Sequence, residues 1–238
     1  MPISENFERV KKQVWEACQK TGRDPKEVRI VSVSKNRTEE DIIEAFGAGA
    51  RDFGENKVQE MEGKKYPKSG SGINGAVTMH FIGRLQANKA KACVGLADYI
   101  HSIDTLELAR KVDAECLRQG KRVKVLVQVN VTGESTKSGV RPFGALQMAE
   151  EMVAQMKGLE LLGLMTMAEK ASGSTGNAET GKAEEARPAF KQLKSLLSLV
   201  NAKLGLSLGE LSMGMSQDFQ VAVEEGATII RVGSAIFE

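Results

Sequence analysis

The stretch Val28-Arg29-Ile30-Val31-Ser32-Val33-Ser34-Lys35 has the composition of a buried strand that ends on a lysine. A lysine in that position lies at the mouth of a core, where partial desolvation can remove its charge. The neutral amine is then a nucleophile toward a carbonyl carbon, which is the usual beginning of Schiff-base chemistry. A strand that simply ends in a solvated charge has the same local sequence, and this stretch alone favours that second interpretation.

The overall composition excludes several classes of protein. Of the 238 residues, 41% are hydrophobic and 27% are charged, as in ordinary globular chains. The formal net charge of +2 gives no general attraction to nucleic acid or to a membrane surface. The first residues are too polar for a signal peptide, and no 18-residue apolar stretch occurs. We therefore expect a cytoplasmic protein with no nucleic-acid or membrane partner.

The spacing of cysteine and histidine argues against disulfides and metal sites. The three cysteines, Cys18, Cys93 and Cys116, lie far apart, and no two have the spacing of a zinc finger. Neither His80 nor His101 has a neighbouring ligand pattern for zinc. We expect no bound metal.

Strand-like and helix-like segments alternate along most of the chain. Several strand candidates are continuous apolar runs, which is typical of parallel strands covered on both faces. The helical segment Leu106–Gln119 closes on Gly120, and Arg187–Leu204 closes on Gly205. With residues 28–35 the strand candidates number eight, the others being residues 51–56, 79–83, 99–104, 123–130, 159–167, 210–215 and 228–234.

Eight such units in 238 residues fit a closed (β/α)8 barrel better than an open doubly wound sheet. No Gly-x-Gly-x-x-Gly follows the first strand, which weakens the dinucleotide-binding alternative. The first 20 residues form an amphipathic pattern through Phe7, Val10, Val14 and Cys18, with Ser4 as a candidate N-cap. We predict an α/β fold in which residues 1–238 are one domain, a single-domain (β/α)8 TIM barrel with an extra N-terminal helix.

Two segments do not follow the alternation, residues 62–77 and 169–186. Both lack an apolar period and are rich in glycine, serine or charge, so we expect loops. The second follows the sixth strand at the face where barrels carry their active sites. It is either a lid over that face or a disordered excursion.

The residues that follow the strands form one candidate site, because the carboxyl ends of barrel strands meet at the active face. Lys35 follows the first strand, and the seventh and eighth strands carry glycine and serine in residues 211–216 and 231–234. Glycine lets backbone N–H groups approach an anion, and barrels often bind phosphate after these two strands. The competing interpretation makes Gly214 and Gly233 turn glycines and the serines helix caps, and Ser216 in particular is a candidate cap.

A lysine able to form an imine, opposite a phosphate cradle, suggests pyridoxal 5′-phosphate (PLP). The cofactor would extend from Lys35 to Ser212, Gly233 and Ser234. Arg231 would then lie near the pyridine ring, and its permanent charge would disfavour a protonated ring nitrogen. Such a site is biased against chemistry that passes through a fully developed carbanion.

The same residues resemble the YggS/PROSC family of pyridoxal phosphate homeostasis proteins, single-domain relatives of the alanine racemase barrel. The resemblance extends from about residue 28 to residue 237. It is carried, in order, by VSK at 33–35, RDFGEN at 51–56, HFIGRLQANK at 80–89, HSID at 101–104, QVNV at 128–131, KSG at 137–139, GLMT at 163–166, ELSMGMS at 210–216 and GATIIRVGSAIF at 226–237.

This resemblance implies a (β/α)8 barrel that holds PLP as an internal aldimine on Lys35. By position, Asn56 lies on the side of the ring hydroxyl, and Ile82 and Met165 line the ring. Arg231 faces the ring nitrogen, while Ser212, Gly233 and Ser234 hold the phosphate; Ser234 stands where threonine is more usual. The family is thought to buffer PLP and to influence the balance of vitamin B6 and amino acids, without an established catalytic activity.

We expect a PLP-binding protein of vitamin B6 homeostasis with no catalytic residues, a monomer that serves apo PLP-dependent enzymes as partners. The alternative is a PLP-dependent amino-acid racemase or decarboxylase. Racemases on this barrel add a C-terminal β-domain that supplies a second acid/base, and this chain ends soon after the eighth strand. A class I aldolase that uses Lys35 lacks the supporting carboxylate and second lysine expected of it.

Overall fold

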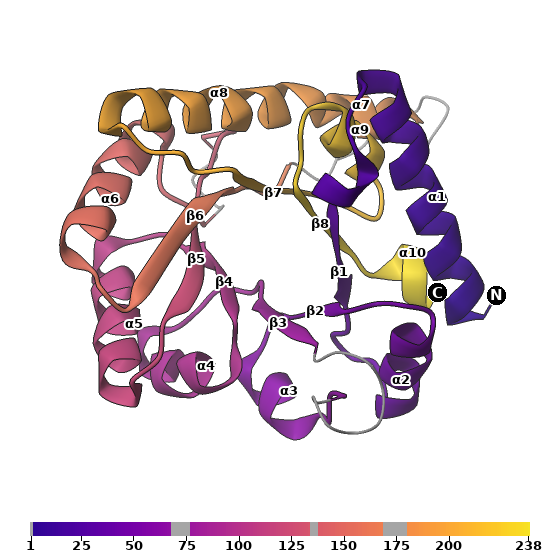
Figure 1. The fold of residues 1–238 in the computed structure, drawn as a ribbon, viewed down its shortest axis with the longest axis horizontal. Helices are drawn as coiled ribbons and strands as arrows, with labels where there is room; N and C mark the ends of the chain where they lie inside the picture. Colours follow the sequence, from indigo (N-terminus) through magenta and orange to yellow (C-terminus); the bar gives the residue numbers. More distant parts are fainter. Residues whose placement is uncertain (1, 68–76, 134–137, 169–179) are drawn as a thin grey trace.

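Parallel strands close into a barrel in this computed structural model, which describes residues 2–67, 77–133, 138–168 and 180–238 (Figure 1). Within these residues, eight strands follow one another in chain order around the barrel, and β8 pairs with β1 to close it. Helices pack around the outside (Figure 1). This closure confirms the (β/α)8 TIM barrel and excludes the open doubly wound sheet.

All eight expected strands are present, and most are shorter than the sequence pattern predicts. Lys35 and Asn56 therefore lie beyond the strand ends, and Ser234 is already the first residue of a helix. The strands are β1 (Arg29–Val33), β2 (Asp52–Glu55), β3 (Thr78–Phe81), β4 (Tyr99–Ile103), β5 (Val123–Gln128), β6 (Leu159–Met165), β7 (Glu210–Met215) and β8 (Ile229–Val232).

The helices between the strands follow the expected alternation. They are α2 (Glu39–Gly47), α3 (Val58–Gly63), α4 (Ala90–Leu96), α5 (Leu106–Gln119), α6 (Pro142–Gln155), α7 (Thr180–Glu185), α8 (Arg187–Leu204), α9 (Phe219–Glu224) and α10 (Ser234–Phe237), with the 3-10 turns η1 (Pro25–Glu27) and η2 (Ala87–Lys89). The prediction of a loop over residues 169–186 is wrong in its last part, where α7 forms. Residues 169–179 of that loop lie outside the described residues. The same holds for residues 68–76 of the other expected loop.

The extra N-terminal helix is α1 (Ile3–Thr21), which packs against α9 and α10 beside the start of the barrel (Figure 1). Phe7, Val10, Val14 and Cys18 are buried, as their spacing predicts. Ser4 is not its N-cap: the helix begins at Ile3, and Pro2 holds the N-cap position without a side-chain hydrogen bond.

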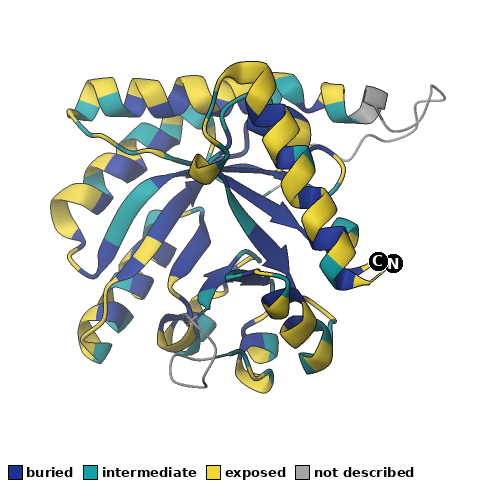
Figure 2. Cartoon of the chain, turned by 45° about the vertical axis from the view of Figure 1, so that its right-hand side comes forward, coloured by how far each residue is buried: buried dark blue, intermediate teal, exposed yellow. Residues whose placement is uncertain are grey.

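Among the described residues, the interior of the molecule is partly apolar and partly polar. The larger apolar region lies between the strands and the helices, whose inward faces are buried and whose outer faces are exposed (Figure 2). Inside the barrel the apolar cluster is small and consists of Val31, Leu126, Met165 and Ile229. Buried polar side chains lie inside the barrel as well, and some of them reach the mouth.

We predict that Gly163→Ala disrupts the pairing of β6 with β7. Gly163 lies opposite Glu210, and a Cβ at Gly163 would lie 1.8 Å from the Glu210 backbone oxygen. The strands must separate to admit it, so the free energy of unfolding should fall by about 3 kcal/mol in urea titrations. Gly209→Ala is the control, since a Cβ there meets nothing within 4 Å. It should change stability by less than about 1 kcal/mol, and equal losses in the two variants would contradict the prediction.

Candidate functional site

A cavity of about 510 Å³ opens at the carboxyl ends of the strands. Its lining comes from the carboxyl-terminal parts of β1, β5, β7 and β8, from the residues that follow β1, β2, β3, β5, β6, β7 and β8, and from the last residue of the chain. Six of the eight expected site residues line it: Lys35, Asn56, Ile82, Arg231, Gly233 and Ser234. A second cavity of about 550 Å³, between η2 and the start of α5, shares Arg84 with the first.

Lys35 lies in the turn after β1 and is exposed at the cavity. Its side-chain amine makes no hydrogen bond or ion pair with any other residue that the structure describes. The next residue, Asn36, has the left-handed φ of +57°, and Glu60 accepts a hydrogen bond of 2.8 Å from the Asn36 backbone N–H. Glu60 thus fixes the backbone of the turn, while the Lys35 amine stays available to a ligand.

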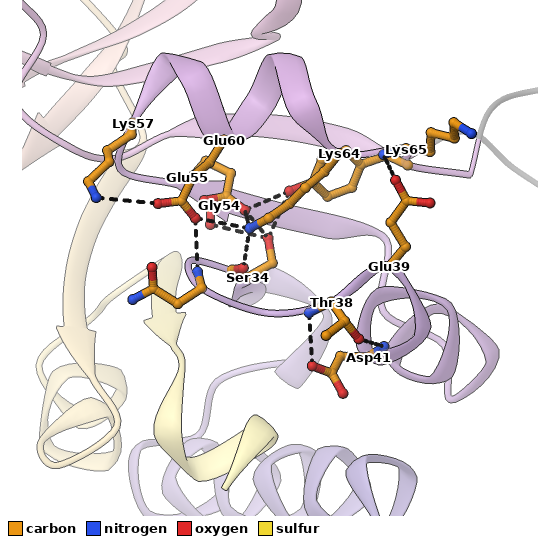
Figure 3. Close-up of polar contacts among 12 residues, drawn as sticks. Ser34, Thr38, Glu39, Asp41, Gly54, Glu55, Lys57, Glu60, Lys64 and Lys65 are labelled. Atoms are coloured by element: carbon orange, nitrogen blue, oxygen red, sulfur yellow. Dashed lines mark hydrogen bonds and ion pairs between the residues drawn. The ribbon is translucent and has the colours of Figure 1, made fainter.

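A buried polar cluster supports this turn from below (Figure 3). The Lys64 amine donates to the Ser34 carbonyl at 2.7 Å, to Glu55 at 2.7 Å and to Glu60 at 3.0 Å. The hydroxyls of Ser34 and Tyr66 donate to the same oxygen of Glu55, at 2.9 and 2.7 Å. Burial raises the pKa of the Tyr66 hydroxyl far above its usual value, so it stays a donor. The cluster joins the ends of β1 and β2 to the segment after α3.

Beside the Lys35 turn, the residues after β7 and β8 are joined by Ser216. Its hydroxyl oxygen accepts the backbone N–H groups of Gly233 at 3.1 Å and Ala235 at 3.3 Å. Ser216 therefore caps the start of α10, whereas the sequence pattern placed it as a cap of the following helix α9. Ser216 also lines the cavity beside Gly233 and Ser234, and it is a site residue that the sequence interpretation left as a cap.

Ser212 and Met165 are the two expected site residues that the structure does not bring to the cavity. Both are fully buried inside the barrel, and neither is among the described residues that line the cavity. Met167 takes the expected place of Met165 at the wall. Alternation along a strand shows which face a residue occupies and not how deep it lies, so Met165 and Met167 could not be distinguished from the pattern.

Arg231 crosses from the barrel interior to the cavity. Its guanidinium donates to the Ser212 hydroxyl at 2.6 Å and to the Thr166 carbonyl at 2.9 Å. Burial lowers its pKa to about 10, against the opposing effect of Asp218, so it remains a cation at neutral pH. The cation is held in one orientation and is 4% exposed.

Asn56 supplies an unused acceptor. Its side-chain Oδ1 is buried and has no hydrogen-bond partner among the described residues. Gly83 packs closely against the backbone of Asn56, and a Cβ on Gly83 would lie 2.0 Å from the Asn56 backbone carbonyl oxygen. A buried acceptor without a partner is costly. A ligand hydroxyl or N–H in this cavity would satisfy it.

The site therefore combines an available amine, a fixed cation, hydroxyls, an unpaired amide oxygen and the apolar walls of Val33, Ile82 and Met215. No cluster of three or more histidine, cysteine or acidic side chains that could hold a metal ion occurs among the described residues. In the same part of the chain, no helix is long and apolar enough to cross a bilayer. The donor set suits an anionic aromatic carbonyl compound.

Comparison with known proteins agrees with this geometry. The family model of the alanine racemase N-terminal domain matches residues 8–238. The pyridoxal phosphate homeostasis protein of Pseudomonas aeruginosa is 37% identical over 235 residues, which is 99% of this chain and 94% of that protein. The human protein of the same name is 36% identical, over 96% of this chain and 83% of its own length. PipY of Synechococcus elongatus, solved with PLP bound, is 33% identical with a TM-score of 0.80, over 99% of this chain and 100% of PipY.

We predict that Lys64→Met destabilises the protein by about 3–5 kcal/mol, because it leaves the fully buried carboxylate of Glu55 without its cation. Lys57→Met is the matched control, since Lys57 pairs with Glu60 at 3.7 Å and is largely exposed. The control should lose less than about 1 kcal/mol. Chemical denaturation of both variants checks the difference, and a Lys64→Met protein as stable as the control would refute the structural role of the cluster.

Proposed function

The chain belongs to the family of pyridoxal phosphate homeostasis proteins, built on the barrel of the alanine racemase N-terminal domain, and from this premise we propose that it binds PLP and buffers its supply. The observation that carries the proposal is the placement of Lys35, Gly233 and Ser234 side by side in the lining of one cavity, after the paired strands β1 and β8. An amine and a set of phosphate donors in one cavity match the aldehyde and the phosphate of PLP. The unpaired Oδ1 of Asn56 adds an acceptor for the ring hydroxyl between them.

Lys35 is the residue that we propose to form the covalent bond. Its amine nitrogen would attack the aldehyde carbon of PLP, and loss of one water molecule would leave a C=N bond to the protein. The amine has no competing ion pair among the described residues, which supports this role. The Glu55–Lys64 cluster fixes the turn that carries it.

For the phosphate we propose Gly233 and Ser234, with Ser216 added from the structure. Ser216 supports the loop by accepting from Gly233 and Ala235, and it faces the same cavity. Ser212 is withdrawn from direct phosphate contact because it lies behind Arg231. The walls of the ring site are Ile82 and Met167, since Met165 lies deeper.

Arg231 is the residue that we propose to face the ring nitrogen. Bound PLP supplies an electron sink, and a protonated ring nitrogen makes that sink stronger. A buried guanidinium cannot accept a proton from the ring, and its charge opposes protonation of the nitrogen. The site therefore favours keeping PLP over using it for carbanion chemistry.

We propose that the protein is a carrier and not a racemase or decarboxylase. Such enzymes need a second acid/base beside the cofactor. The tyrosines Tyr66 and Tyr99 and the histidines His80 and His101 do not line the cavity in the described part of the chain. Asp218 does, but its carboxylate accepts the Met215 backbone N–H at 2.6 Å. Delivery to apo PLP-dependent enzymes, the monomeric state, the single domain over residues 1–238 and the cytoplasmic location stay predictions.

Borohydride reduction of the PLP-loaded protein should leave a phosphopyridoxyl group on Lys35, found by peptide mass spectrometry. Lys35→Ala should lose both this adduct and the imine absorbance band. Lys57→Ala, an exposed lysine outside the cavity, should keep both. An adduct on another lysine in the unaltered protein would refute the assignment of Lys35, and enzyme-like turnover of an amino acid would refute the carrier assignment.

Ser216→Ala should weaken PLP binding roughly tenfold to a hundredfold, the usual effect of losing one hydrogen bond to a charged group. The reason is the loss of a donor and of the link to Gly233 and Ala235. Ser207→Ala, on the exposed segment before β7, is the control and should leave the affinity unchanged. Fluorescence titration with PLP measures both, and equal affinities would remove Ser216 from the site.

A further inference from the structure

The two histidines of the chain lie inside the barrel and are hydrogen-bonded to each other. His80 on β3 and His101 on β4 are both fully buried. His80 Nδ1 is 2.9 Å from His101 Nε2. Neither lines the cavity in the described part of the chain, so a direct role toward a ligand does not explain them.

These histidines are the middle of a continuous path from one end of the barrel to the other. His80 Nε2 is 2.8 Å from Asp52 Oδ1, at the start of β2. His101 Nδ1 is 2.8 Å from the Ser212 hydroxyl, which accepts from Arg231 at 2.6 Å. We call Asp52, His80, His101 and Ser212 the relay. It connects a carboxylate at the amino-terminal end of the strands to the cation at the cavity.

The geometry determines where each proton lies. Arg231 can only donate, so the Ser212 oxygen accepts from it and has one proton left to give. That proton goes to His101 Nδ1, which makes His101 a neutral ring with its proton on Nε2. This proton is donated to His80 Nδ1, and His80 in turn donates from Nε2 to Asp52. Every group in the relay is then satisfied with both histidines neutral.

The reverse arrangement fails at both ends. If His101 Nδ1 donated to Ser212, the serine proton would have no acceptor among the described residues. His80 would then carry its proton on Nδ1 and turn a lone pair toward the carboxylate of Asp52. Burial lowers the pKa of both histidines, which disfavours the charged ring that could avoid this conflict.

The groups around the relay also fix its direction. Arg29 lies 3.4 Å from the Asp52 carboxylate and 3.5 Å from Glu210, and Tyr99 stacks on His80 with ring centroids 4.6 Å apart. The relay thus ends in a paired carboxylate on one side and in Arg231 on the other. Hydrogen bonds aligned between opposite charges polarise one another in a buried site. Apolar side chains in place of these charged groups would often give an equal or higher free energy of unfolding.

We propose that the relay is a positioning device for the cofactor site: Asp52, acting through His80, His101 and Ser212, holds the guanidinium of Arg231 in the orientation that meets the ring of PLP. Asp52 and the histidines touch no ligand and are positioning residues. The ligand part of this inference rests on the proposed function, whereas the proton arrangement does not.

The first experiment needs no cofactor. Long-range ¹H–¹⁵N spectra of the ¹⁵N-labelled chain, free of PLP, should show both imidazoles as neutral Nε2–H tautomers from about pH 6 to pH 8, around the ordinary titration range of histidine. Asp52→Asn should give mixed tautomers, because the asparagine side chain can accept or donate. An Nδ1–H tautomer or an imidazolium in the unaltered protein would overturn the relay, whether or not the protein binds PLP.

The second experiment measures PLP affinity and the absorbance maximum of the bound cofactor. Asp52→Asn should weaken binding roughly fivefold and shift the maximum, since it removes the charge that orients the path to Arg231. Glu210→Gln is the matched control, because Glu210 is also paired with Arg29 but lies outside the relay. It should stay within about twofold of the unaltered protein, below the worth of one hydrogen bond.

Ser212→Ala tests the other end of the relay. It gives an independent result if Asp52→Asn does not fold. It should reproduce both the weaker binding and the spectral shift of Asp52→Asn. If Asp52→Asn and Glu210→Gln have equal effects, or if Ser212→Ala leaves the spectrum unchanged, the positioning role is refuted. Failure of the unaltered protein to bind PLP would refute the proposed function instead. The tautomer spectra would still test the proton arrangement of the relay, because they need no cofactor.

Discussion

Hydrogen bonds between β1 and β8, which pair Val31 with Arg231 and Ser32 with Val232, close the strands into a barrel. Lys35 and the Gly233–Ser234 start of α10 come from opposite ends of the chain and become neighbours only through this pairing. An open sheet would leave β1 and β8 apart and would separate Lys35 from Gly233 and Ser234. The chemistry that we propose depends on this closure, since an amine without the phosphate donors beside it would not select PLP.

Closure also creates an interior that must be filled, and this barrel fills part of it with polar groups. The apolar cluster of Val31, Leu126, Met165 and Ile229 occupies one portion. The relay occupies another and ends on Arg231, while Glu55 and Lys64 form a second buried polar cluster beneath Lys35. Both polar groups lead to residues of the cavity. Buried polar groups often stabilise a fold less than apolar side chains do. Their placement indicates that they serve to hold Lys35 and Arg231 in position.

The fold could be predicted from the sequence because it depends on local patterns: apolar runs for the parallel strands and glycines at the helix ends. The positions of Lys35, Gly233 and Ser234 followed from the rule that strand ends meet at one face. The depth of Met165 and Ser212 did not follow, because alternation repeats along a strand without marking where the interior ends. Nor could the pairing of His80 with His101 be predicted, since it depends on the register of β3 against β4. Ser216 was visible only as a cap, because its partners Gly233 and Ala235 lie on the next strand and helix.

The most direct test of the account is a crystal structure of the protein grown with PLP. The account predicts continuous electron density from Lys35 Nζ to the aldehyde carbon of the cofactor. The phosphate should lie against Gly233, Ser234 and Ser216, and the guanidinium of Arg231 should face the ring nitrogen. Density for PLP in the second cavity, between Arg84 and Asp104, with Lys35 left free, would contradict it.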